Sequence, residues 1–165
     1  MILGRGHGVI AETKITKSVM ARVLNVDSDF LYNSFNYFPI VSAMAGTKGN
    51  GLHISNALTS IYLATGQDTA CVAENSLGHF NIEKKEDGLI FRLTLPSLTV
   101  GTVGGGTRLN QQQQNLKLLG CDTGKYSSRK LAEIIAAATI GLEISLLSAI
   151  ASHTWTSAHM KYGRK

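Results

Sequence analysis

Charged residues are scarce in this sequence, and so are proline and cysteine. Only 16% of the 165 residues are Asp, Glu, Lys or Arg, against roughly 25% in an average soluble domain, while 44% are hydrophobic. This composition excludes a disordered polyelectrolyte and predicts one domain folded around a core. The two prolines exclude proline-rich linkers, and the two cysteines exclude a disulfide-stapled miniprotein. We expect part of the poorly charged surface to be covered by another segment or subunit.

The cysteines and histidines do not form a metal-binding pattern. Cys71 and Cys121 have no Cys or His at ligand spacing beside them, and His153 and His159 lack a third ligand. We therefore expect reduced thiols and no metal ion. The first ten residues are too short and too rich in glycine for a secretory signal, which favours a cytoplasmic location.

The net charge of +5 is concentrated at the C-terminus. Lys161, Arg164 and Lys165 supply three of these charges, and the sequence has no basic stripe with interleaved aromatic residues. A nucleic acid is therefore not an expected partner. Residues 134–151 form a long apolar run whose only charge is Glu143. We interpret this run as a buried helix, not a membrane span, because the charge lies in its middle.

The residue pattern predicts an α+β fold. Residues 9–15 read as a strand, Thr16 as the cap of a short helix, and residues 80–95 as a hairpin that ends at Pro96. We expect a helix from about residue 53 to 72, a short helix at 111–119, and a long helix that Ser127 or Ser128 caps and that ends near Trp155, before a polar tail.

Asp68 is the first candidate for chemistry. It follows Ile61 by seven residues and Ala64 by four, so an unbroken helix would carry it into the interior with the apolar face. Burial disfavours a carboxylate unless a cation or hydrogen bonds hold its charge. The residue is therefore either a paired structural group or an acid/base group with a shifted pKa.

Three further features could bind a ligand. The glycine cluster at 101–106 would allow backbone N–H groups to surround a phosphate, or simply form a sharp turn. His53 and Asn56 share a helix face, where they either bind a polar ligand or cap the helix. His159 lies beside the basic tail, where it either shuttles protons or has no role.

Several of these segments together resemble the C-terminal part of the catalytic region of HMG-CoA reductase, in the order in which that family has them. The combination of SAMAG at 42–46, GQD at 66–68 and GTVGGGT at 101–107 is specific. The other matches are Gly4-Arg5-Gly6, Leu95-Pro96-Ser97, Gly120, Glu143-Ile144-Ser145-Leu146 and Ser157-Ala158-His159-Met160.

The resemblance implies a reaction and a set of site residues. Two hydride transfers from NADPH would reduce HMG-CoA to mevalonate and release CoA, at a site formed between two subunits of a homo-oligomer. Asp68 matches the catalytic aspartate, and His159 matches the histidine that protonates the departing thiolate from a mobile tail. The matched substrate-binding residues are His53, Asn56, Ser145 and Leu146, and those that approach the cofactor are Val103, Gly104 and Gly105.

The sequence also departs from the family pattern. Only three residues precede the Gly4-Arg5-Gly6 match, so we expect the cofactor-binding small domain, the catalytic glutamate, the catalytic lysine and the membrane anchor of eukaryotic relatives to be missing from residues 1–165. Tyr37 stands where the family has a substrate-binding lysine, and a phenol cannot supply a cation. We therefore expect a partial large domain that is inactive alone. The alternatives are an inactive paralogue that pairs with a complete subunit, or a small anion- or nucleotide-binding module.

Overall fold

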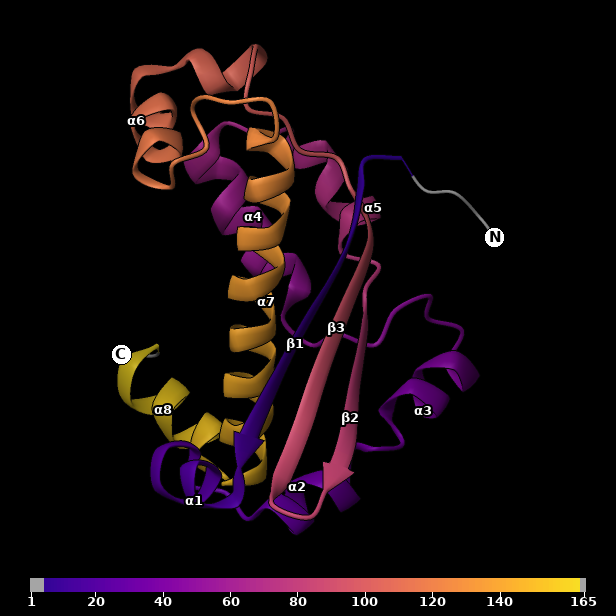
Figure 1. Cartoon of the computed structure of the whole chain (residues 1–165). Helices are drawn as coiled ribbons and strands as arrows, with labels where there is room; N and C mark the ends of the chain where they lie inside the picture. The colour runs from indigo at the N-terminus through magenta and orange to yellow at the C-terminus, as the bar shows by residue number, and fades with distance from the viewer. Residues whose placement is uncertain (1–4, 164–165) are drawn as a thin grey trace.

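The computed structural model describes residues 5–163, which form a three-stranded antiparallel sheet covered by helices (Figure 1). The strands are β1 (His7–Thr16), β2 (His79–Lys85) and β3 (Gly88–Leu98). The longer helices are α2 (Ser28–Phe35), α3 (Phe38–Met44), α4 (Ile54–Thr65), α6 (Asn110–Leu118), α7 (Ser127–Ala151) and α8 (Thr154–Tyr162). The short ones are α1 (Lys17–Val19), η1 (Met20–Leu24), η2 (Thr69–Cys71), α5 (Val72–Asn75) and η3 (Gly105–Arg108). The predicted α+β class is confirmed.

The sheet has the order β1-β3-β2, and its hairpin is the one that the sequence predicts. Lys85 pairs with Gly88, so Glu86 and Asp87 form the two-residue turn. Gly88 is required by packing as well, because a Cβ there would lie 2.1 Å from the carbonyl oxygen of Ile15 on β1. The local turn and the pairing of distant strands therefore depend on the same glycine.

The predicted end of the hairpin at Pro96 is wrong, because β3 continues to Leu98. Proline lacks the N–H that a central strand needs on one side. Here the β2 pairing stops at Thr94, and the β1 register shifts between His7 and Val9, opposite Pro96. The irregular pairing lets the strand pass through the proline and carry Ser97 toward the site described below.

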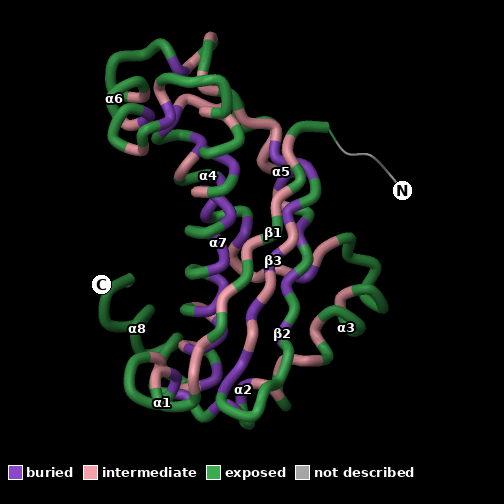
Figure 2. Tube along the Cα trace, in the orientation of Figure 1, coloured by how far each residue is buried: buried purple, intermediate pink, exposed green. Residues whose placement is uncertain are grey.

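Helix α7 forms the centre of the packing, with its buried residues following one side (Figure 2). It packs against β1, β3 and α4, and Figure 1 places α6 and α4 near its first residues and α1 and α8 near its last. Its length and composition alone would also let it cross a membrane, which is weak evidence. Its buried face includes Glu143, the charged residue in the middle of the apolar run.

Two helix boundaries differ from the predictions. The helix that begins after His53 ends at Thr65, because Gly66 takes the left-handed conformation with φ of 72°. The long C-terminal helix ends at Ala151, because His153 has φ of 58°, and α8 then replaces the predicted polar tail as far as Tyr162. Neither Ser127 nor Ser128 caps α7 through its side chain; the N-cap position is Tyr126.

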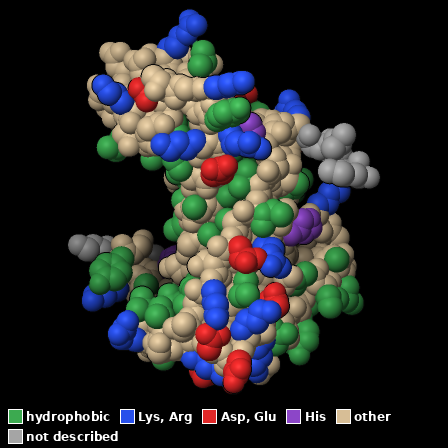
Figure 3. All heavy atoms as spheres, viewed as in Figure 1, with side chains coloured by type: hydrophobic (Ala, Val, Ile, Leu, Met, Phe, Trp, Pro, Cys, Tyr) green, Lys and Arg blue, Asp and Glu red, His purple; other side chains and the backbone are tan. Residues whose placement is uncertain are grey.

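The surface of the sheet carries mixed charges (Figure 3). Ion pairs join neighbouring elements there, including Glu12 to Arg92 and Lys14 to Asp87. Helix α3, in contrast, exposes apolar side chains, with Ile40 63% exposed and Met44 84% exposed. The expectation that another segment or subunit covers part of the surface stays a prediction.

Candidate functional site

The C-terminal end of α4 and the glycine segment 101–107 are in direct contact. A Cβ on Gly66 would lie 2.4 Å from the carbonyl carbon and oxygen of Gly106, and a Cβ on Gly106 would lie 2.7 Å from the oxygen of Gly66. The side-chain oxygen of Gln67 accepts a hydrogen bond of 2.8 Å from the Gly101 N–H. The GQD and GTVGGGT motifs are therefore two halves of one local structure.

Asp68 is exposed, so the prediction that it faces the interior is wrong. The spacing from Ile61 and Ala64 places Asp68 on their face only if the helix continues, and it ends at Gly66. Asp68 instead caps η2, where its carboxylate accepts a hydrogen bond of 3.0 Å from the Ala70 N–H. The second carboxylate oxygen has no hydrogen bond within the described residues and is free to meet a ligand.

Asp68 and the glycine segment line a common open cavity of about 580 Å³. Gly104 and Gly105 have φ of 85° and 55°, and a Cβ on either would point into open space. The neighbouring Val103 is 86% exposed. Among the described residues that line the cavity, Asp68 carries the only charge. This arrangement admits a flat or extended ligand close to the backbone, but it supplies no cation for an anion.

Buried hydrogen bonds hold the floor of this cavity in place. The side-chain oxygen of Asn75, a residue that is 0% exposed, accepts from the Tyr62 hydroxyl at 2.6 Å and from the Thr99 N–H at 3.0 Å. The Asn75 amide group donates to the Ser97 carbonyl. Burial raises the pKa of the Tyr62 phenol, which keeps it a hydrogen-bond donor. α4, α5 and the end of β3 are thus fixed to one another below Asp68.

An ion pair ties the N-terminal segment to the same region. Arg5 Nη2 lies 2.7 Å from Glu74 Oε2, and this hydrogen-bonded pair lowers the pKa of Glu74 and raises the pKa of Arg5. The Ser97 hydroxyl donates to the Arg5 carbonyl at 2.6 Å. The Arg5-Gly6 part of the matched tripeptide therefore lies beside α5, whereas Gly4 is outside the described residues.

His53 and Asn56 lie at the opposite end of α4. The Asn56 side-chain nitrogen is 3.0 Å from His53 Nδ1, and neither side chain caps the helix, contrary to the capping alternative. Glu143 of α7 instead holds the backbone just before the helix, where its two oxygens accept hydrogen bonds from the N–H groups of Leu52 at 2.8 Å and His53 at 2.5 Å. Burial raises the pKa of this carboxyl group. Sequence reasoning missed this contact, although the lone charge in an apolar run was its signal.

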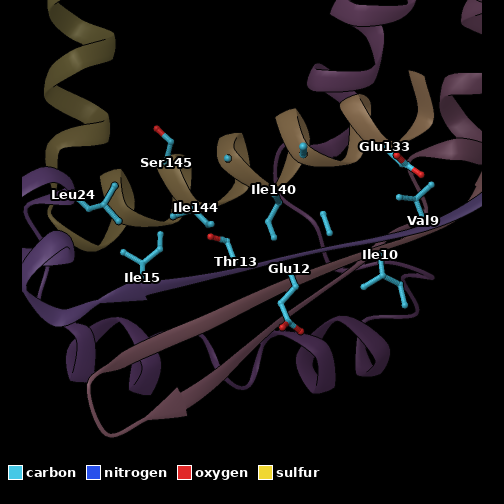
Figure 4. A pocket seen from close by; sticks show the side chains of 13 residues that line it. Val9, Ile10, Glu12, Thr13, Ile15, Leu24, Glu133, Ile140, Ile144 and Ser145 are labelled. Atoms are coloured by element: carbon cyan, nitrogen blue, oxygen red, sulfur yellow. The ribbon is translucent and has the colours of Figure 1, made fainter. Parts of the chain in front are cut away.

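Ser145 and Leu146 do not join either end of α4. Ser145 is exposed at the border of an apolar groove of about 610 Å³ between α7 and β1, and in Figure 4 its hydroxyl points away from the strand, whereas Ile144 points toward it. Leu146 is half-buried one turn beyond Glu143. The prediction that both residues bind substrate stays a prediction, and the two side chains point in different directions from α7.

His159 lies on α8, which follows the end of α7, whereas Asp68 shares its cavity with the glycine segment, whose Thr102 is hydrogen-bonded to Ser127 at the start of α7. His159 is exposed on α8, where its Nδ1 lies 2.9 Å from the Trp155 carbonyl oxygen and its ring lies 4.2 Å from the Trp155 ring. The structure places this residue in a helix, and the expectation that the tail is mobile stays a prediction. A helix of 25 residues is about 37 Å long, so one chain in this conformation does not bring Asp68 and His159 together.

Two other predictions can be placed. Tyr37 is 58% exposed immediately before α3, a helix that contacts β2 and not the glycine segment. Within residues 5–163, no group of three or more His, Cys, Asp or Glu side chains is arranged to hold a metal ion, and Cys71 and Cys121 are free thiols.

Comparison with known proteins gives one consistent answer. A family model described as hydroxymethylglutaryl-coenzyme A reductase matches residues 1–164. The chain is 40% identical over 166 residues to the 3-hydroxy-3-methylglutaryl-coenzyme A reductase of Methanocaldococcus jannaschii, and 43% identical over 169 residues to that of Aeropyrum pernix. Each match covers 99% of this chain but 40% of the relative. For reductase 2 of Gossypium hirsutum, at 41% identity, the shares are 99% and 27%. The chain thus spans less than half the length of these relatives.

Proposed function

Because the chain belongs to the hydroxymethylglutaryl-coenzyme A reductase family of oxidoreductases, we propose that it forms part of the large domain of an enzyme that reduces HMG-CoA to mevalonate. Two hydrides and two protons convert the thioester carbon to a primary alcohol, and the bond between that carbon and sulfur breaks to release CoA. NADPH is the proposed hydride source. The family as a whole implies a nicotinamide cofactor.

The observation that carries this proposal is the shared cavity of Asp68 and the glycine segment. Asp68 is held by its contact with Ala70 and by Gly66, while one oxygen of its carboxylate is free. A carboxyl group placed there can hold a proton for the carbonyl oxygen of the thioester as hydride arrives at carbon. The carboxyl group alone does not stabilise the negative charge that develops on that oxygen, which needs a nearby cation. We propose that a lysine outside residues 1–165 supplies this cation.

The glycine segment fits the nicotinamide end of the cofactor. The open space beside Gly104 and Gly105 allows a flat ring to approach the backbone, and Val103 offers an apolar edge. No basic side chain lines this cavity among the described residues, so the cofactor phosphates require other residues. The same absence weighs against the alternative of an anion-binding module that functions alone.

We propose that the site is completed by a second subunit. The length of α7 separates Asp68 from His159, so His159 of one copy can protonate a thiolate only at a site to which another copy contributes, or after α8 moves. His53 and Asn56 would then bind the acyl-CoA along α4. This reading supports the expected homodimer and explains the expectation that one isolated chain is inactive.

Mevalonate formation tests the proposal. The isolated 165-residue chain is expected to form no mevalonate from HMG-CoA and NADPH, with the complete Methanocaldococcus jannaschii reductase as positive control. A chimera in which this chain replaces the matching segment of that reductase is expected to be active. Asp68→Asn in the chimera should lower kcat by roughly 10²-fold or more. Turnover by the isolated chain, or full activity of the Asp68→Asn chimera, would contradict the proposal.

Tyr37 gives a second use for the same chimera. If the HMG carboxylate is bound at this position, Tyr37→Lys supplies the missing cation and should lower KM for HMG-CoA about tenfold, because a charge-assisted hydrogen bond contributes about 1.5–3 kcal/mol. An unchanged KM would place the carboxylate elsewhere. A chimera that is inactive until Tyr37 is replaced would favour the inactive-paralogue alternative.

A further inference from the structure

Glu143 is an unusual residue for its position. It is the only charge in the apolar run of α7, it is 0% exposed, and it is the only buried charged side chain among residues 5–163. Burial raises the pKa of its carboxyl group, since no Lys or Arg side chain pairs with it. Burying an unpaired carboxyl group costs free energy, so we expect this carboxyl group to make a contact that the fold or the site requires.

The need lies at the start of α4. The N–H groups at a helix start lack partners within the helix, and they are usually satisfied by the side chain at the N-cap position. His53 holds that position but makes no capping bond. The Glu143 oxygens accept hydrogen bonds from the N–H groups of Leu52 and His53, just before the first helical residue Ile54, and so hold the backbone that carries the His53 ring.

This arrangement leaves two side chains available for a ligand. A Ser, Thr or Asp at position 53 would cap the helix locally, but its side chain would then be occupied. The His53 side chain makes no such bond, and its half-exposed ring is hydrogen-bonded to Asn56 while Glu143 holds its backbone. The Asn56 amide nitrogen can only donate, so His53 Nδ1 accepts, and the proton of the neutral ring lies on Nε2, where it can be donated to a ligand oxygen.

We propose that Glu143 is a positioning residue that sets the orientation of the His53–Asn56 pair for binding the acyl-CoA substrate. The inference rests on the proposed function for the identity of the ligand. The placement of the His53 ring depends only on the contacts described here. Glu143 does not touch the substrate in this account, and it acts through the backbone of residues 52 and 53.

The test compares Glu143→Gln with Glu133→Gln, which changes an exposed glutamate on the same helix. Glutamine keeps the shape but has one acceptor oxygen, so one of the two N–H groups loses its partner. We expect amide hydrogen exchange at Leu52 or His53 to accelerate at least tenfold, the His53 ring nitrogen signals to lose the pattern of an accepting Nδ1, and the Kd for CoA to rise roughly tenfold. Removing a buried charge offsets the lost bond, so the urea midpoint should stay close to that of the wild type. Glu133→Gln should change none of these quantities.

Three results separate the possible failures. Unchanged His53 signals and an unchanged Kd in Glu143→Gln overturn the inference. Equal changes throughout the protein, with a lowered urea midpoint, assign Glu143 a structural role and also overturn it. If the wild-type chain does not bind CoA, the proposed function fails for this chain, while the His53 signals still decide the positioning role. Should Glu143→Gln not fold, Glu143→Asp keeps the charge but shortens the side chain, and the same exchange and signal changes are expected.

Discussion

The two ends of α4 are held by different means. At the C-terminal end, Gly66 and Gly106 allow two backbones to touch, and the contact is made by short motifs with no side chain between them. At the N-terminal end, a carboxylate 90 residues later in the chain accepts hydrogen bonds from the backbone at the entry to the helix. The first end depends on shape and the second on charge. The backbone contact that positions Asp68 should therefore be sensitive to added side-chain volume. The carboxylate contact that positions the His53–Asn56 pair should be sensitive to pH and to the loss of an acceptor oxygen.

The largest expected effect comes from filling the space between the glycines. Gly66→Val combines a left-handed φ with a Cβ placed 2.4 Å from the Gly106 backbone, so we expect the free energy of unfolding to fall by roughly 2–4 kcal/mol. Gly46→Val is the matched control, because Gly46 has φ of 78° but open space around its Cβ; it should cost only about 1–2 kcal/mol. Urea unfolding measures both. Equal losses would mean that the contact between the two motifs contributes nothing.

A smaller effect, dependent on pH, is expected at the other end. Burial raises the pKa of Glu143 in the folded protein, so the folded state binds this proton more tightly than the unfolded chain does. The contribution of Glu143 to stability is therefore largest below the unfolded pKa of about 4.3, falls as the pH rises toward the raised folded pKa, and is constant above it. The difference in unfolding free energy between wild type and Glu143→Gln should follow this course in urea titrations at several pH values. A difference that grows with pH in this window would contradict the assigned direction.

The smallest effect on stability is expected for Asp68→Asn. Asp68 is exposed, and asparagine can accept the Ala70 N–H equally well, so the free energy of unfolding should change by about 0.5 kcal/mol or less. Urea unfolding of the isolated chain checks this. A loss above about 2 kcal/mol would show that the Asp68 charge supports the fold, and would weaken its proposed role as an acid in the reaction.

Much of the architecture could be predicted from local patterns, and the failures have identifiable causes. The hairpin predicted at residues 80–95 follows from alternating apolar residues around a two-residue turn, and both of its strands are present, although β3 continues to Leu98. The prediction that Asp68 faces the interior is wrong because it assumes helical spacing past Gly66, where a residue in the left-handed conformation ends the helix. The break before α8 arises from the positive φ of His153, for which the sequence has no glycine signal.

For the candidate site, the motifs could be predicted from the sequence, but the long-range contacts between them could not. The contact of GQD with GTVGGGT joins motifs that the family resemblance already singled out. The bond from Glu143 to His53 joins positions 90 residues apart and depends on tertiary packing, so the sequence indicated only that a charge was present in an apolar run. The distance between Asp68 and His159 also became apparent only with the direction of α7 in the fold.

The central claim is that both ends of α4 belong to one ligand-binding surface. NMR titration of the wild-type chain with HMG-CoA tests it directly, because amide signals report each position separately. The account predicts shifts at His53 and Asn56, and also at Asp68 and Val103–Gly105. Shifts confined to the groove beside β1, at Ile10 and Gly141, or to one end of α4 alone, would contradict it.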